Sequence, residues 1–265
     1  MVGYHVVRVV IAPPEILEVN LVKEVASILN KDLYGTRLLL AGKIPRVVNN
    51  YQTTQEAESI ANRLKALGIV AIVCNDSELH QPASMGFRAH TLKLGVAEFT
   101  FWNKSGESRR VQTEDVFLIL KGKMQTYTGK EMTPTKMKFS LPATILTGGI
   151  PIWRQIKEKT SDMSFKTESF VRLYNRMSPE PSVEIFESDF DYSFLGEKIA
   201  PSSLTNLNTI IVELRNTFPQ AIFNDKLAMF FGADASFSAR GDDIEVNCKL
   251  IYLCHKAAGN LSPST

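Results

Sequence analysis

The chain has 265 residues, of which 44% are hydrophobic, and its net charge at neutral pH is +2. This length exceeds one average domain, and the composition excludes global disorder. The three cysteines include no C-x-x-C pair, which argues against a disulfide framework and favours a reducing compartment. No stretch reaches the roughly 18 apolar residues of a membrane span, and the N-terminus lacks the pattern of a signal peptide. We therefore expect a soluble cytoplasmic protein.

Residues 53–74 contain every signal of a helix followed by a strand. Thr53 and Glu56 form the T-x-x-E pattern of a capping box, in which each side chain binds an amide that the helix start leaves unpaired. A narrow apolar stripe at intervals of three and four residues follows, made of Ala57, Ile60, Ala61, Leu64 and Leu67. Gly68 suits a left-handed helix end, and the uninterrupted apolar run Ile69–Cys74 is typical of a buried strand.

Residues 1–80 predict one α/β unit. Tyr4–Ala12, rich in Val and Ile, is expected to be a buried strand, and a helix with an apolar stripe follows it. Thr36–Ala41 and Arg46–Val48 are interpreted as two antiparallel strands, because the few residues between them are too short for a crossover helix. With residues 53–74 the order becomes βαββαβ, a ferredoxin-like unit. Its second half resembles the helix–strand half of sporulation-related repeat (SPOR) domains, which have the same order and bind cell-wall glycan; the resemblance concerns the fold alone.

Residues 85–150 change to short strands separated by polar turns. The alternating segments are His90–Leu94, Glu98–Trp102, Arg110–Gln112 and Val116–Leu120. We interpret them as an antiparallel meander in a small barrel or sandwich. The succession of strands and turns is similar to that of bacterial pleckstrin-homology-like domains. Gly148–Pro151 then indicates a hinge-like break before the last part of the chain.

Residues 151–265 predict a C-terminal α/β unit, so that the whole chain is expected to be α+β and to have three parts. Ile152–Lys159 is expected to form one or two helical turns. Phe170–Arg176 and Ser182–Glu187 are interpreted as a hairpin around a proline-containing turn.

Two longer helices are considered in this C-terminal unit. The first has Ser202 or Ser203 as its cap and runs through Phe218. Its apolar stripe is assigned to Leu207, Ile210, Ile211 and Val212, continued by Phe218. The second segment, residues 243–258, is left open between a helix and a strand. The strand alternative arises because apolar residues alternate perfectly at Ile244, Val246, Cys248 and Leu250.

The sharpest candidate site is the acidic stretch 184–191 that follows the predicted hairpin. If this stretch were extended, Glu187, Asp189 and Asp191 would project to one face at period two. Three carboxylates in that arrangement could bind Mg²⁺ or Mn²⁺, as in metal-dependent nucleases. The E-x-K spacing typical of such enzymes is missing. A solvated loop, or a cap for the following helix, explains the same residues.

A second candidate site comes from the uneven charge. Residues 101–160 carry eleven Lys or Arg against five Asp or Glu, a net charge of +6, whereas residues 161–265 carry nine against fourteen, a net charge of −5. Spaced cations with interleaved aromatic residues are typical of nucleic-acid binding. The residues assigned to this candidate site are Arg109, Arg110, Lys121 and Lys123. A Lys-rich edge that deters aggregation, or pairing with the acidic end of the chain, would give the same pattern.

Common catalytic signatures are absent from the sequence, which contains no GxxxxGK[ST] or GxGxxG loop, no GxSxG and no HExxH. Cys248, Cys254 and His255 share a segment without the spacing of helical zinc ligands, so the thiols are interpreted as buried. The sequence therefore favours a non-enzymatic binding or regulatory protein with an unidentified protein or small-molecule partner. The alternatives are a metal-dependent nuclease or phosphohydrolase using residues 184–191, and a nucleic-acid-binding protein using the basic segment. No cofactor is predicted, other than the divalent metal ion that the first alternative would need.

Overall fold

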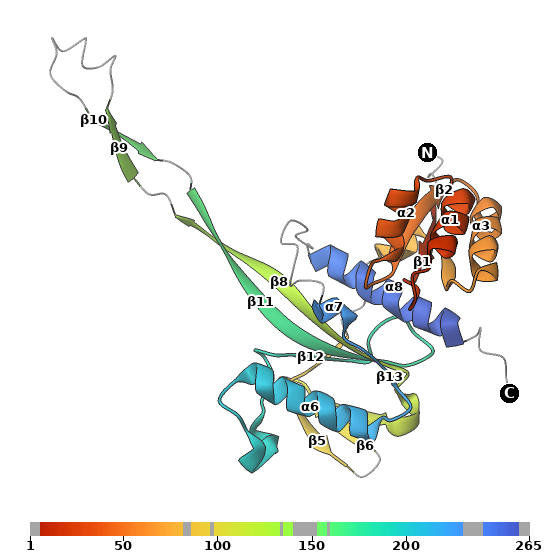
Figure 1. Cartoon of the computed structure of the whole chain (residues 1–265). Coiled ribbons are helices and arrows are strands. Elements are labelled where there is room, and N and C mark those ends of the chain that lie inside the picture. Colours follow the sequence, from red (N-terminus) through yellow and green to blue (C-terminus); the bar gives the residue numbers. More distant parts are fainter. Residues whose placement is uncertain are drawn as a thin grey trace, which may run out of the picture. The chain divides into compact units, whose positions relative to one another are not determined.

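The computed structural model describes residues 6–81, 86–95, 98–132, 135–139, 153–157, 160–229 and 241–259. The chain divides into two compact units, residues 125–167 and residues 1–124 together with 168–265. Helices and sheets are both present, which confirms the α+β class (Figure 1). The predicted hinge Gly148–Pro151 lies outside the described residues.

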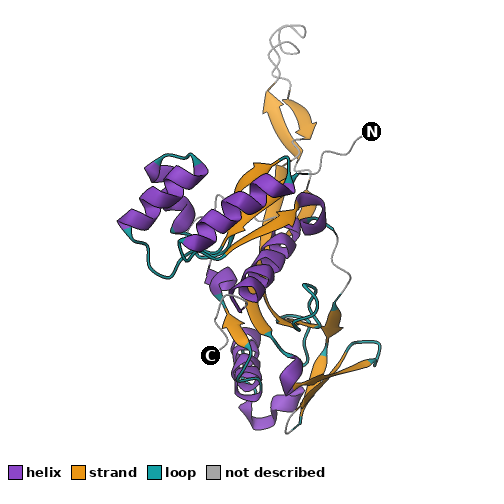
Figure 2. Ribbon diagram, turned by 90° about the vertical axis from the view of Figure 1, so that its right-hand side faces the viewer, coloured by secondary structure: helices purple, strands orange, loops and turns teal. Residues whose placement is uncertain are grey.

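The N-terminal part of the larger unit is a three-stranded antiparallel sheet covered by helices. Strand β1 (Val7–Ile11) is central and pairs with β2 (Arg46–Tyr51) on one side and with β3 (Ala71–Asn75) on the other. Helices α1 (Val19–Leu29) and α3 (Thr54–Ala66) pack on one face of this sheet (Figure 2). Their shared core is formed by Val9, Ile11, Val25, Leu29, Ala57, Ala61 and Leu64.

Helix α3 and strand β3 confirm the interpretation of residues 53–74. The hydroxyl of Thr53 accepts a hydrogen bond of 3.3 Å from the backbone N–H of Glu56. Gly68 follows the helix with φ of +80°, a conformation that is unfavourable for residues with a Cβ atom. Local capping therefore sets both ends of this helix.

The predicted strand Thr36–Ala41 is wrong, because these residues belong to helix α2 (Leu33–Leu40) and its end. Asp32 caps the helix: its Oδ1 accepts a hydrogen bond of 2.7 Å from the backbone N–H of Gly35. A run of leucines continues a helix readily once such a cap has started it. The order is therefore βααβαβ, and the ferredoxin-like assignment of residues 1–80 is corrected to a three-stranded sheet with antiparallel neighbours.

The larger unit also contains a mixed sheet of five strands, two of which continue into residues 125–167. In spatial order its strands are β13 (Ile222–Asn224), β8 (Leu118–Met132), β11 (Thr160–Tyr174), β12 (Val183–Phe186) and β4 (Phe87–Ala89). β13 runs parallel to β8, and β12 runs parallel to β4 but antiparallel to β11. The segments 85–150 and 151–265 thus contribute strands to one sheet.

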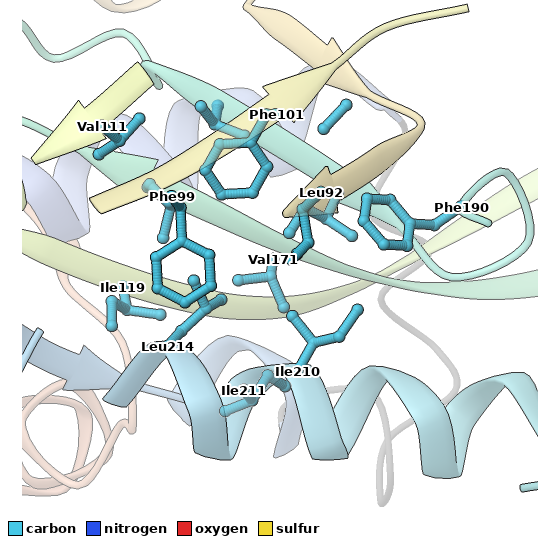
Figure 3. Close-up of a cluster of buried hydrophobic side chains, with 14 of the residues drawn as sticks. Leu92, Phe99, Phe101, Val111, Ile119, Val171, Phe190, Ile210, Ile211 and Leu214 are labelled. Atoms are coloured by element: carbon cyan, nitrogen blue, oxygen red, sulfur yellow. The ribbon is translucent and has the colours of Figure 1, made fainter. Parts of the chain in front are cut away.

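One face of this sheet is covered by a smaller antiparallel sheet, β5 (Thr91–Leu94), β6 (Glu98–Trp102) and β7 (Ser108–Gln112), and by helix α6 (Ser203–Thr217). The three short strands confirm three of the predicted segments. The fourth segment, Val116–Leu120, instead leads into β8 of the other sheet, so the expected four-stranded meander is corrected. Figure 3 shows the shared core, in which Phe99 and Phe101 of β6 face the α6 side chains Ile210, Ile211 and Leu214.

Helix α6 begins as predicted, since the hydroxyl of Ser202 accepts a hydrogen bond from the backbone N–H of Thr205. Its assigned stripe needs one correction. Val212 is 54% exposed, whereas Leu214 is fully buried. Residue 214 lies three and four positions after Ile211 and Ile210 and therefore shares their face, while residue 212 has turned away from it.

Helix α8 (Gly241–Gly259) settles the open assignment of residues 243–258 in favour of a helix. One face packs against the five-stranded sheet through Ile244, Cys248, Ile251 and Tyr252. The opposite face packs against the N-terminal sheet through Val246, Leu250 and Cys254. Both faces contain residues spaced by four, and the two interleaved stripes produce the alternation that also suggested a strand. Helix α8, apolar on both sides, therefore joins the two sheets (Figure 1).

The smaller unit contains the paired strands β9 (Thr135–Phe139) and β10 (Trp153–Lys157). The helical turns predicted for Ile152–Lys159 are therefore wrong, because Trp153–Lys157 pairs residue by residue with β9. The remaining short elements are α4 (Asp76–Leu79), η1 (Thr113–Asp115), η2 (Ser193–Lys198) and α7 (Lys226–Met229). Among the described residues, no helix has the length and apolar content needed to cross a membrane.

Candidate functional site

The acidic stretch is not extended. Strand β12 ends at Phe186, and residues 187–189 form a turn, so the predicted projection of its carboxylates to one face does not arise. The Glu187 carboxylate accepts hydrogen bonds from the Ser203 hydroxyl at 2.8 Å and from the backbone N–H of Ser169 at 3.2 Å. Glu187 therefore links the start of α6 to β11.

Asp191 closes a turn of its own. Its Oδ1 accepts a hydrogen bond from the backbone N–H of Ser193, and its Oδ2 accepts one from the Ser193 hydroxyl, both at 2.9 Å. These bonds, the backbone one first, lower the pKa of Asp191. Both carboxylate oxygens of Asp191 are thus hydrogen-bonded within the turn at Ser193.

Asp189 lies between two cations. Its Oδ2 is 2.9 Å from Nε of Arg88, and its Oδ1 accepts a hydrogen bond from Nζ of Lys104. The hydrogen bond from Lys104, and then the charge of Arg88, lower the pKa of Asp189. The side chain is 22% exposed, so this charge pairing faces solvent. Protein cations, each from a different strand or turn, balance the Asp189 carboxylate.

The three predicted metal ligands thus have separate partners. Within the ranges that the structure describes, no group of three or more His, Cys, Asp or Glu side chains is placed to hold a metal ion. Burial raises the pKa of Cys74 and Cys248 to about 11, and that of Cys254 to about 12. These thiols are therefore protonated at neutral pH, whereas a metal ion binds the thiolate.

The four predicted basic residues lie on two strands. Arg109 of β7 donates a hydrogen bond of 2.6 Å to the carbonyl oxygen of Ser182, and its guanidinium lies 5.0 Å from the centre of the Phe87 ring. Arg110, the next residue of β7, is exposed. Because successive residues of a strand project to opposite faces, these two arginines do not share a surface.

Lys121 of β8 is turned towards helix α6, where its Nζ donates a hydrogen bond of 2.8 Å to Oδ1 of Asn208. Lys123 follows on the same strand and is half-buried. Among the described residues, therefore, Lys121 and Arg109 share no contact.

A cavity of about 510 Å³, here called the cationic cavity, unites one residue of each predicted site, Asp189 and Arg109. Its further lining residues include Phe87, Arg88, His90, Asn103, Lys104 and Glu107. The lining residues come from β4, from His90 between β4 and β5, from the β6–β7 turn and β7, and from the turn after β12. Two patterns that the sequence presented as separate alternatives therefore meet in one place.

His90 is held by the backbone of the same turn. Its Nδ1 lies 2.6 Å from the carbonyl oxygen of Asp189. A carbonyl oxygen only accepts hydrogen bonds, so Nδ1 carries a proton and donates it. The imidazole thereby positions the turn that presents the Asp189 carboxylate.

Sequence reasoning missed Arg88, His90 and Lys104. Asp189 follows Lys104 by 85 residues and His90 by 99 residues, so no local pattern connects them. The one available signal is that Lys104 lies in the polar turn Asn103–Gly106 between two strongly alternating strands. Turn side chains of that kind face solvent and often contact ligands.

Similarity to known proteins does not identify the ligand of this cavity. No protein-family model matches the chain, and neither a curated protein nor a solved structure matches it. The assignment of a function therefore depends on the contacts and charges described above.

Proposed function

We propose that the chain is a non-enzymatic binding protein whose cationic cavity takes an anionic group, a phosphate or a carboxylate, of its ligand. The supporting observation is an excess of cations, since Arg88, Lys104 and Arg109 line the cavity against Asp189 and Glu107. Arg88 pairs with Asp189 through Nε, its guanidinium carbon lies 4.3 Å from the centre of the Phe186 ring, and its side chain is 55% exposed. The planar guanidinium matches the oxygens of phosphate and carboxylate groups.

The contacts favour binding over catalysis. A general base works best with a pKa near the operating pH, whereas Lys104 and then Arg88 hold the pKa of Asp189 below its ordinary value. A metal-dependent phosphohydrolase would place a divalent cation beside Asp189. Two protein cations already contact that carboxylate, and their charges would oppose such an ion.

Isothermal titration of the full chain with pyrophosphate and with citrate tests this proposal. Both anions are expected to bind at low ionic strength, and added salt should weaken binding because the cations are exposed. Arg109→Ala should weaken binding by about three- to tenfold, since it removes one close charge in a solvated cavity. Arg110→Ala is the matched control, because Arg110 is adjacent on β7 and does not line the cavity.

Asp189→Asn separates this proposal from the metal-dependent enzyme. Here the substitution removes the anion that competes with a ligand for Arg88 and Lys104, so affinity for pyrophosphate should rise by about threefold. In an enzyme that holds a metal ion at Asp189, the same substitution would abolish turnover. Hydrolysis of a phosphodiester with Mg²⁺ or Mn²⁺, lost in Asp189→Asn, would contradict a binding function.

The nucleic-acid alternative differs from the cavity proposal because it predicts phosphate contacts at many basic residues over the surface. Phosphate contacts along a strand of nucleic acid would make Arg110, Lys121 and Lys123 contribute about as much as Arg109. Filter binding of random DNA and RNA to the four single Ala variants measures these contributions. Equal losses would favour a nucleic-acid surface, whereas a loss confined to Arg109→Ala supports the cavity.

We also propose that the protein works in the cytoplasm. Its cysteines Cys74, Cys248 and Cys254 are all free and buried. Unpaired thiols are typical of reducing compartments. Fractionation of the producing cells checks this location.

A further inference from the structure

A second cavity, of about 550 Å³, lies between the N-terminal sheet and helix α8. We call it the junction cavity. Its floor is apolar: Ile69, Ile251 and Cys254 line it and are each at most 4% exposed. The segment after β1 and the residue Pro45 before β2 add further apolar wall. The shape and composition are those of a small-molecule site, which is usually a concave apolar surface with a few polar groups.

The rim of the junction cavity is exposed and charged. Lys43 and Lys226 line it, and Glu15 is the one carboxylate among the described residues of this lining. Ile16 belongs to the same rim and is 73% exposed. An apolar side chain so exposed beside an apolar cavity provides surface that a ligand would remove from water. The rim therefore combines apolar contact with an excess of positive charge.

Two polar side chains in the cavity wall are paired with each other. Nδ2 of Asn224 lies 2.8 Å from Nε2 of His255, and Oδ1 of Asn224 accepts a hydrogen bond of 3.1 Å from the backbone N–H of Lys226. Asn224 therefore donates through Nδ2, which makes Nε2 of His255 the acceptor. Burial, and then the charge of Lys226, lower the pKa of His255, so the imidazole is neutral at pH 7. The positive charge of the cavity thus comes from its lysines.

We propose that the junction cavity binds an amphipathic carboxylate, a molecule with an aliphatic body and one anionic head group. Its volume lies within the range of about 300–1,000 Å³ that is typical of small-molecule sites. The aliphatic body rests on the Ile69 and Ile251 floor and covers Ile16, and the head group meets Lys43 and Lys226. This site is separate from the cationic cavity and does not rest on the function proposed for it.

Octanoate and 1-octanol are suitable probes, because they share an aliphatic chain and differ in charge. In the full chain labelled at isoleucine δ1 methyl groups, octanoate should shift the signals of Ile16, Ile69 and Ile251. The signals of Ile119 and Ile210 should not move, because these residues lie in the core between the five-stranded sheet and α6. Octanoate should also bind more tightly than 1-octanol, since only octanoate carries the head group that the lysines attract.

Charge reversal at the rim tests the head-group contact. Lys43→Glu combined with Lys226→Glu should weaken octanoate binding by about tenfold or more and leave 1-octanol binding unchanged. Both lysines are exposed, so the variant should fold normally. Lys23→Glu combined with Lys65→Glu, at exposed positions on α1 and α3 outside the cavity lining, is the matched control for the same charge change.

Three results would overturn the proposal. The first is the absence of methyl shifts at millimolar octanoate, and the second is a shift of the Ile119 and Ile210 signals equal to that of the cavity residues. The third is an equal loss of octanoate affinity in the Lys23→Glu and Lys65→Glu double variant, which would show that net charge and not this cavity governs binding.

Discussion

Replacing Arg172 with Met is expected to lower the free energy of unfolding by about 3–5 kcal/mol, the usual cost of removing one partner from a buried ion pair. The Arg172 side chain is only 4% exposed and lies between the five-stranded sheet and α8. Its Nε is 2.8 Å from Oε1 of Glu184, and its terminal nitrogens donate to both carboxylate oxygens of Glu245. Met has a similar length and no charge, so both carboxylates would lose their partner.

The size of this loss should depend on pH. Burial raises the pKa of Glu184, and Arg172 opposes that shift. Without Arg172 the folded-state pKa of Glu184 would rise further above the unfolded value, so the folded variant binds more protons and gains stability as the pH falls. The deficit of Arg172→Met should therefore be smaller at pH 5 than at pH 7. Urea denaturation of both proteins at the two pH values measures it.

Arg88→Met is the matched control. Arg88 lies opposite Glu184 in the register of β4 and β12, but its side chain is 55% exposed and pairs with Asp189 at the surface. Its replacement should cost less than about 1 kcal/mol. Adding Glu245→Gln to Arg172→Met should restore part of the lost stability, because it neutralises one of the abandoned carboxylates. Equal costs at residues 172 and 88 would contradict the role assigned to burial.

Leu214→Ala is expected to cost about 2–5 kcal/mol. Leu214 is fully buried, and Figure 3 shows it on α6 beneath Phe99 and beside Ile119. The substitution removes methyl groups from a core enclosed by two sheets and a helix. These elements can move only partly into the cavity that the substitution creates. The loss combines the lost burial with the cavity left behind.

Val212→Ala on the same helix is the control. Val212 is 54% exposed, so its truncation should change the free energy of unfolding by less than about 0.5 kcal/mol. Urea denaturation at neutral pH compares the two variants. Similar costs would mean that α6 presents a different face to the core from the one described.

Several elements could be predicted from the sequence because their signals are local. Helix α3 is delimited by residues of its own segment. The hydroxyl of Thr53 caps its start through the backbone N–H of Glu56, and Gly68 follows its end. Ser202 starts α6 in the same way. Strand β6 has the predicted limits Glu98–Trp102. Each of these features depends on residues only a few positions apart.

Elements that pack on two sides are ambiguous in sequence. In α8 the stripe that includes Ile244 and Cys248 faces one sheet, and the stripe that includes Val246 and Leu250 faces another. A helix buried on both faces and a strand can therefore show the same alternation. The helix is distinguished from a strand only in the tertiary structure, where each of its two apolar stripes packs against a different sheet.

The candidate site was also predictable from the sequence only in part. Its sequence signals were a carboxylate cluster and a basic segment, and these selected Asp189 and Arg109 for unrelated reasons. The tertiary structure decided that both line one cavity, because the turn after β12 lies beside β4 and the β6–β7 turn. It also decided that Arg88 and Lys104, which no sequence pattern selected, are the cations that contact Asp189. Side-chain chemistry could be listed from the sequence, but the pairing of charges far apart in the chain follows only from how the sheets bring their turns together.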